Sequence, residues 1–157
     1  MDLIFWRHAE AEDGLLDDLP SMHDADRTLT QRGEKQAARM ALWLDRQLPE
    51  GARILVSPAK RCEQTAMALG RKYKTHVELA PDGTPSQLLE LVQWPGNKHP
   101  VLVIGHQPTL GQTIAQLLAL KDGDCTVKKG ALWWLRNRDR QGQSRTVVVT
   151  VQSPELL

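Results

Sequence analysis

The chain has 157 residues, enough for one domain with a buried hydrophobic core. Hydrophobic residues make up 41% and charged residues 25% of it, which is typical of a globular rather than a disordered protein. A formal net charge of +1 gives no support for binding to nucleic acid or to a membrane surface. The cysteines, Cys62 and Cys125, are too few for a disulfide framework, and no apolar run resembles a signal peptide or a membrane span. We therefore expect a cytoplasmic protein.

Apolar runs typical of buried parallel strands alternate with segments of helical periodicity. The first expected strand lies at residues 3–6. A helix is expected after Thr30, an N-cap residue, because apolar residues then recur at steps of four, three and four. A second strand at residues 53–56 runs into Ser57 and Pro58, which we expect to cap and to open the next helix.

The same alternation continues through the second half of the chain. Residues 76–79 are expected to form a short strand, and Thr84-Pro85 to begin a third helix. Another apolar strand at residues 101–104 is followed by a helix that begins near Pro108.

The C-terminal part of the chain completes the expected sheet. Residues 131–135 and 146–151 predict two strands, which the polar stretch 136–145 would join as a hairpin. Strands that alternate with helices predict an α/β fold, here a single three-layer α/β/α domain over residues 1–157. We expect its sheet to be mostly parallel, with helices on both faces.

Three of the expected strands lead directly into unusual polar residues. The first ends in Arg7 and His8, the second leads to Arg61, and the third ends in His106. In open α/β sheets ligands bind beyond the carboxyl ends of the strands, so these side chains are expected to share one site. Two arginines can fork onto phosphate oxygens, and the start of the following helix favours an anion. The pattern therefore predicts a phosphate-binding site.

Clustered histidines also suggest a second hypothesis, a metal site. The two arginines beside them would repel a cation, and no carboxylates lie at the matching strand ends. We therefore expect no bound metal.

These motifs resemble the signatures of the histidine phosphatase (phosphoglycerate mutase-like) superfamily. Its Arg-His-Gly, Ser-Pro-x-x-Arg-x-x-Gln-Thr-Ala and Gly-His motifs are matched in order by residues 7–9, 57–66 and 105–108. With the Leu-Thr-x-x-Gly sequence at residues 29–33, the chain is most similar to the SixA-type phosphohistidine phosphatases. The resemblance implies a phosphoglycerate mutase-like fold. Alanine stands at the third position of the first motif, where the superfamily usually has glycine.

The resemblance also implies roles for the four converging residues. His8 would be the nucleophile that attacks phosphorus, and Arg7, Arg61 and His106 would surround the transferred phosphoryl group. Nearby guanidinium cations would favour the neutral imidazole that attack requires. Water would then hydrolyse phosphorylated His8 and release inorganic phosphate, with no metal or organic cofactor.

The general acid is where the chain departs from the family pattern. Many members place a glutamate after the strand that follows the arginine motif, and no residue here matches it clearly. Glu10, Glu78 and Asp82 are the candidates. An alkoxide leaving group needs an acid, whereas an imidazole, with a reference pKa of about 6.5, needs it much less. The missing match therefore favours a P–N bond, as in phosphohistidine, over a sugar phosphate.

An acidic segment at residues 9–27 separates the nucleophile from the first helix. It carries seven carboxylates, with Arg27 as its one fixed positive charge. The segment is either a solvated connector or a border of the site that disfavours polyanions and favours a partly basic protein surface.

Three functions remain open at the level of the sequence. The first hypothesis is a phosphatase of phosphohistidine on a signalling protein of a phosphorelay or phosphotransfer chain. The alternatives are a small-molecule phosphomonoesterase and a phosphate-binding interaction module without turnover.

Overall fold

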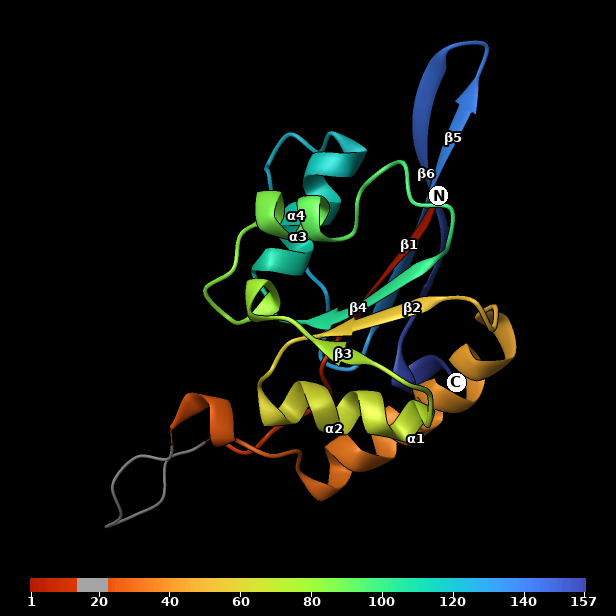
Figure 1. Ribbon diagram of the computed structural model, residues 1–157. Helices are drawn as coiled ribbons and strands as arrows, with labels where there is room; N and C mark the ends of the chain where they lie inside the picture. The colour runs from red at the N-terminus through yellow and green to blue at the C-terminus, as the bar shows by residue number, and fades with distance from the viewer. Residues whose placement is uncertain (14–22) are drawn as a thin grey trace.

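The computed structural model describes residues 1–13 and 23–157, whose strands form one mixed sheet in the order β3-β2-β4-β1-β5-β6 (Figure 1). The neighbouring pairs among the first four strands run parallel, and β5 and β6 are antiparallel to their neighbours. The strands are β1 (Asp2–Arg7), β2 (Arg53–Val56), β3 (Lys74–Thr75), β4 (Val101–Gly105), β5 (Leu132–Arg140) and β6 (Gln143–Gln152). The expected α/β fold is confirmed.

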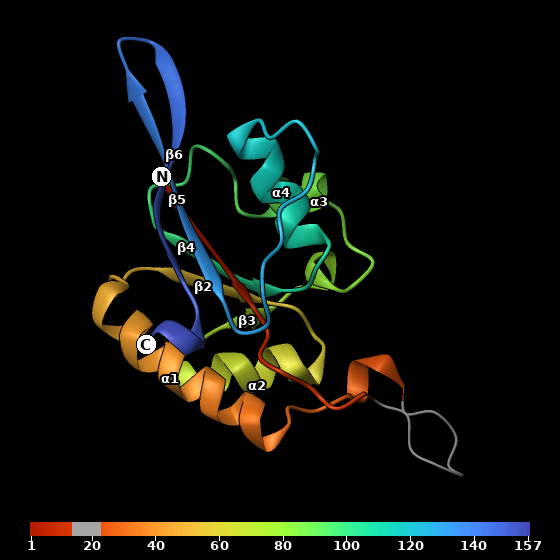
Figure 2. The ribbon, with the colours of Figure 1, turned by 180° about the vertical axis from the view of Figure 1, so that it is seen from behind.

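Helices cover both faces of this sheet, as Figures 1 and 2 show from opposite sides. They are α1 (Gln31–Gln47), α2 (Lys60–Leu69), α3 (Pro85–Leu91) and α4 (Thr109–Leu118). Ile4 and Trp6 of β1 pack toward α1 and α2, whereas Leu3 and Phe5 pack toward α3 and α4. All four of these side chains are fully buried, because a central strand covered on both faces has no polar side. No helix among the described residues is long and apolar enough to span a membrane.

The helix starts follow the capping residues in two cases out of three. The Thr30 hydroxyl accepts the Gly33 N–H at the start of α1, and Thr84 forms a capping box at the start of α3. Ser57 is not the N-cap of α2, which begins later, at Lys60. Its hydroxyl instead accepts the Ala59 N–H and makes a hydrogen bond with the ring of His106, which directly follows β4.

The prediction of a strand at residues 76–79 is wrong. The edge strand β3 lies just before it, and residues Val77–Leu79 form a 3-10 turn. In a strand, Val77 and Leu79 would point to the same face. In the turn Leu79 is 4% exposed and enters the core, while Val77 is 74% exposed.

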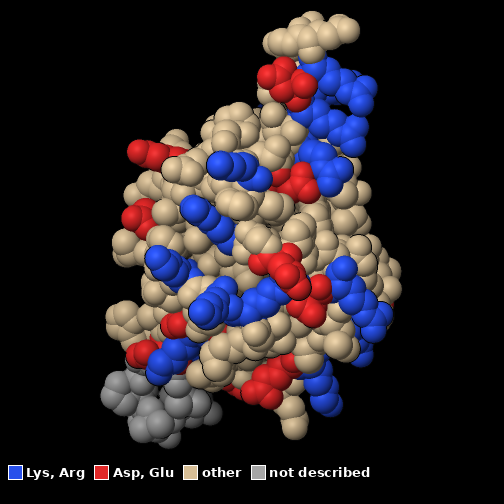
Figure 3. All heavy atoms as spheres, turned by 45° about the vertical axis from the view of Figure 1, so that its right-hand side comes forward, with Lys and Arg blue, Asp and Glu red and all other residues tan. Residues whose placement is uncertain are grey.

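The C-terminal hairpin is longer than expected. The polar stretch 136–145 is not a loop, because β5 and β6 continue through it to a turn at Gln141 and Gly142 with φ of 55° and 78°. Beyond Arg136 the ribbon projects from the body (Figure 1), and arginine side chains gather on it (Figure 3). Both of its faces are solvated there, so no apolar alternation marks these strands in the sequence.

Candidate active site

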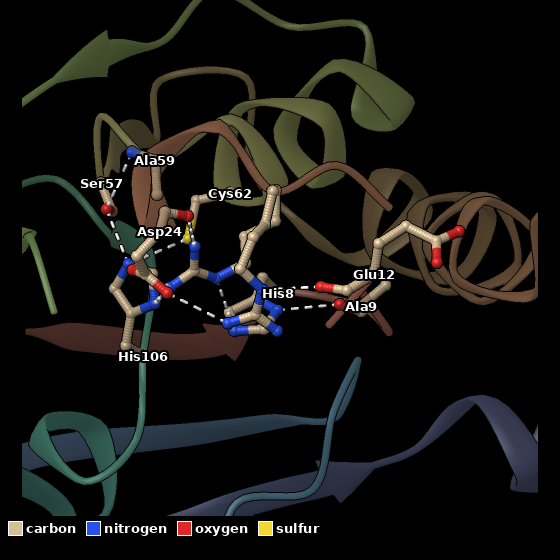
Figure 4. A network of polar contacts seen from close by, with 10 residues as sticks. His8, Ala9, Glu12, Asp24, Ser57, Ala59, Cys62 and His106 are labelled. Carbon is tan, nitrogen blue, oxygen red and sulfur yellow. Dashed lines mark hydrogen bonds and ion pairs between the residues drawn. The ribbon is translucent and has the colours of Figure 1, made fainter. Parts of the chain in front are cut away.

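The two histidines lie side by side because the strands that carry them are neighbours. β1 pairs in parallel with β4, with Arg7 opposite Gly105, so both strands release the chain at the same edge. The His8 N–H donates to the Gly105 carbonyl at 3.2 Å, and the rings of His8 and His106 have centroids 5.3 Å apart. Both side chains are buried, and Figure 4 shows the two rings near each other.

Arg61 links the two rings from the first turn of α2. Its Nε donates to Nε2 of His8 at 3.4 Å, and one Nη donates to Nδ1 of His106 at 3.3 Å. The residue is only 4% exposed, so its charge is poorly hydrated. A buried guanidinium placed between two histidines has a strong demand for an anion.

The contacts of His8 define its tautomer. Nδ1 lies 2.8 Å from the Ala9 carbonyl, which can only accept, so Nδ1 carries the proton. Nε2 then presents its lone pair to the Arg61 N–H. Burial, helped by the charges of Arg61 and Arg7, outweighs the Ala9 hydrogen bond and lowers the pKa of His8 to about 4. The ring is therefore neutral at pH 7, with Nε2 as its unprotonated nitrogen.

His106 has the opposite arrangement. Because Arg61 donates to its Nδ1, the proton is on Nε2, which donates to the Ser57 hydroxyl at 2.8 Å. Burial, followed by the neighbouring His8 and Arg61, lowers the pKa of His106 to about 3. Ser57 is fully buried and thus holds the orientation of this ring.

Arg7 supplies the second cation of the site. One of its Nη atoms donates to the Val127 carbonyl at 2.9 Å. Its Nε is buried and has no hydrogen-bond partner among the residues that the structure describes. Burial and the charge of Arg61 lower the pKa of Arg7. A buried orphan N–H beside a second guanidinium is a feature expected of an anion site.

A carboxylate that the sequence analysis did not assign to the site contacts Arg61. Asp24 lies in the 3-10 turn η1 (Asp24–Asp26), and its carboxylate is 3.1 Å from an Nη of Arg61. Its other oxygen pairs with Arg27 at 3.1 Å. Burial opposes ionisation, but the hydrogen bonds from Arg27 and Arg61 prevail and lower the pKa of Asp24. The acidic segment therefore borders the site at this point, whereas Asp17 and Asp18 lie outside the described residues.

The three candidate general acids make their contacts with residues other than the four converging side chains. The Glu10 carboxylate accepts the Thr30 hydroxyl at 2.8 Å, and Glu78 faces His76 at 3.9 Å. Asp82 is exposed. Within residues 1–13 and 23–157, no hydrogen bond or ion pair joins any of these three to the imidazoles or guanidinium groups of the site.

Thr65 is a further residue that the sequence analysis passed over, although it lies in the Gln-Thr-Ala part of a quoted motif. It is fully buried; its hydroxyl accepts the Ala9 N–H at 3.1 Å and donates to the Arg61 carbonyl at 2.7 Å. One side chain thus ties the loop after His8 to the helix turn that carries Arg61.

Other reactive groups near the site are unsuited to nucleophilic or metal chemistry. Burial is the largest of several effects on the Cys62 thiol and raises its pKa to about 12, so it stays protonated. In the part of the chain that the structure describes, no three His, Cys, Asp or Glu side chains converge as metal ligands would.

Comparison with known proteins identifies this arrangement. The sequence profile of the histidine phosphatase superfamily (branch 1) matches residues 3–82. Phosphohistidine phosphatase SixA of Escherichia coli strain K12 is 33% identical over 126 residues, 74% of this chain and 74% of that protein. The chain belongs to the histidine phosphatase superfamily.

Further relatives place this histidine phosphatase close to SixA. The SixA homolog of Haemophilus influenzae is 29% identical over 133 residues, 74% of this chain and 77% of that protein. A solved structure of the protein histidine phosphatase SixA in complex with tungstate superimposes with a TM-score of 0.80 at 28% identity, covering 99% of both chains. The histidine phosphatase described here is thus a SixA-like hydrolase of that superfamily.

Proposed function

We propose that this SixA-like histidine phosphatase removes the phosphoryl group from phosphohistidine on a protein, through an intermediate phosphorylated on His8. The proposal depends chiefly on one observation, the neutral imidazole whose Nε2 lone pair faces Arg61. Attack on phosphorus requires an unprotonated nitrogen, and a pKa of about 4 keeps His8 in that form throughout the neutral range.

In the first step Nε2 of His8 forms a bond to phosphorus as the P–N bond of the substrate breaks, and the substrate ring, protonated on its other nitrogen, leaves as neutral imidazole. Charge on the three equatorial oxygens is stabilised by Arg7 and Arg61, whose planar forks suit phosphate oxygens. His106 lies beside Arg61 and borders the same anion site. These groups are already in position, so little reorganisation is needed during the reaction.

The ionisation of the carboxylate near Arg61 favours a leaving group that needs no strong acid. Asp24 is the carboxylate in contact with Arg61, and its lowered pKa keeps it ionised at neutral pH. It therefore has no proton to give to an alkoxide. An imidazole leaves far more readily without a strong acid, since its reference pKa is about 6.5. This supports a phosphohistidine substrate over a phosphoester.

In the second step water attacks phosphorus and the P–Nε2 bond of His8 breaks. The oxygen of water becomes part of inorganic phosphate, and His8 returns to its neutral form. Arg7, Arg61 and His106 serve the same oxygens in both steps, so no metal or organic cofactor enters the scheme. The names of the relatives support the same substrate class, since two of them are phosphohistidine phosphatases and a third was solved with tungstate, a tetrahedral oxyanion like phosphate.

The test compares phosphate release from a phosphohistidine-bearing protein and from an aryl phosphate. Wild type and His8→Ala are assayed in parallel, and rapid acid-free quenching with radiolabelled substrate traps the intermediate. We expect turnover of the phosphohistidine protein and label on the wild-type chain, and neither in His8→Ala. Turnover of the ester alone would favour the small-molecule phosphomonoesterase. Phosphate binding without turnover of either substrate would favour the interaction module.

A further inference from the structure

The donors of Arg61 are almost fully occupied in this structure. A guanidinium has five N–H groups, and four contacts are made here. Two go to the imidazoles of His8 and His106. The other two go to Asp24: Nη1 donates to its backbone carbonyl at 2.8 Å and Nη2 to its carboxylate at 3.1 Å. Either fork of a guanidinium uses Nη2, and both hydrogens of Nη2 are taken here, one by Asp24 and one by His106. A phosphoryl group that forks onto Arg61 must therefore displace one of these two partners.

Asp24 is the partner that can leave at low cost. The imidazoles are buried on rigid strand ends, whereas the Asp24 side chain is 54% exposed. Figure 4 shows it reaching toward the two rings. Its turn is three residues long and is attached by other side-chain contacts, Arg27 to the Glu12 carbonyl at 2.6 Å and Lys60 to Asp26 at 3.4 Å. The carboxylate can thus move aside while those contacts keep the turn near the site.

A phosphoryl group places two oxygens along one edge of a guanidinium, and Asp24 already places two there, its backbone carbonyl on Nη1 and one carboxylate oxygen on Nη2. We propose that Asp24 is an internal competitor of the phosphoryl group: its carboxylate pairs with Arg61 when no phosphoryl group is bound, is displaced when substrate binds, and returns as phosphate leaves. The proposal rests on the proposed function only in that Arg61 binds the phosphoryl group.

The consequence is that Asp24 sets the affinity of the whole site for its ligands. Asp24 lowers the affinity for every ligand that uses Arg61, including the product, so inorganic phosphate does not accumulate on the enzyme. It also keeps a buried cation neutralised between turnovers, when an unpaired guanidinium would destabilise the fold. Because Asp24 is half exposed, solvent weakens its interaction with Arg61, and the expected effect on affinity is moderate, about two- to five-fold.

The experiment measures binding of inorganic phosphate by isothermal titration calorimetry to wild type, Asp24→Asn and Asp24→Ala. Asp26→Asn is the matched control, because Asp26 lies in the same turn and pairs with Lys60 rather than Arg61. We expect both Asp24 variants to bind phosphate about two- to five-fold more tightly than wild type, and Asp26→Asn to bind like wild type. Thermal unfolding of each variant verifies that it is folded.

Kinetics on whichever substrate the wild type turns over give the second measurement. A competitor predicts that Asp24→Asn lowers KM and the inhibition constant of phosphate together and leaves kcat near the wild-type value. Unchanged phosphate affinity in both Asp24 variants would overturn the proposal. So would a fall in kcat at unchanged affinity, which would make Asp24 part of the chemistry. The calorimetric arm needs no turnover, so failure of the proposed phosphohistidine activity leaves this test intact.

Discussion

The Nε–H of Arg61 donates to Nε2 of His8 across 3.4 Å. Through this contact the guanidinium affects His8 in two ways. It holds the nitrogen lone pair of His8 in the direction of the anion site, and its positive charge disfavours protonation of the same ring. Burial is the largest cause of the lowered pKa of His8, and the group that would bind the phosphoryl group adds to that effect. Changes at either residue should affect both binding and ionisation.

The ionisation of His8 is the first prediction. Its pKa of about 4 lies below the ordinary 6.5, so the folded protein takes up this proton only as the pH falls through about 4. The unfolded chain takes it up near 6.5. Between these values the unfolded state binds more protons, so the free energy of unfolding decreases as the pH falls from 6.5 toward 4. NMR titration of 15N-labelled histidine should give the low midpoint for His8; a midpoint near 6.5 would contradict the assignment.

The second prediction concerns the guanidinium itself. Arg61→Lys keeps the charge but loses the planar fork and the N–H that faces His8, so kcat/KM should fall about 100-fold or more. Steady-state kinetics measure the loss, and the 15N spectrum of His8 should show a changed hydrogen-bonding environment at Nε2. Arg32→Lys, on the exposed face of α1, is the matched control and should behave like wild type. Equal activity of both variants would exclude bidentate binding by Arg61.

Much of the fold could be predicted because its signals are local. The buried runs of β1 and β4 and the caps at Thr30 and Thr84 require no knowledge of the rest of the chain. The errors arose where tertiary contacts decide. Leu79 belongs to a turn because it reaches the core under α3 and α4, and the projecting ribbon has no buried face whose periodicity could reveal it.

The candidate site divides in the same way. His8 and His106 directly follow strands, and Arg61 lies in the helix after a third. The parallel pairing of β4 with both β1 and β2 brings the three together as expected. Asp24 gave no such signal, because it is one of seven acids in a segment without periodicity. Its contact with Arg61 depends on the packing of the turn η1 against α2, which only the three-dimensional structure reveals.

The third prediction tests the tie between the two halves of the site. Thr65→Val keeps the shape of the side chain but removes the hydroxyl that accepts from Ala9 and donates to the Arg61 carbonyl. A buried N–H then lacks a partner, so stability should fall by about 1–3 kcal/mol. Misplacement of His8 and Arg61 relative to each other should lower kcat/KM about ten-fold or more.

Thr65→Ser is the control for this prediction, because it keeps the hydroxyl and loses only a methyl group. We expect about 1 kcal/mol of destabilisation from lost packing and nearly wild-type kcat/KM. Urea unfolding and kinetics on all three proteins separate the two effects. Equal kcat/KM in the valine and serine variants would show that the hydroxyl does not position the site.

The last prediction concerns the close approach of α1 to the loop after the nucleophile. A Cβ at Gly33 would overlap the carbonyl oxygen of Glu10, which also accepts the Thr30 N–H at 3.0 Å. Backbone on both sides leaves no flexible side chain to yield, so Gly33→Ala should destabilise the protein by about 1–3 kcal/mol and, by shifting the loop, reduce activity. Glu34→Ala, at the exposed neighbouring position, should stay within about 0.5 kcal/mol of wild type. Urea denaturation of the Gly33→Ala and Glu34→Ala variants tests this prediction. Equal midpoints would mean that the loop after His8 shifts at no cost and that α1 and the nucleophile are not coupled here.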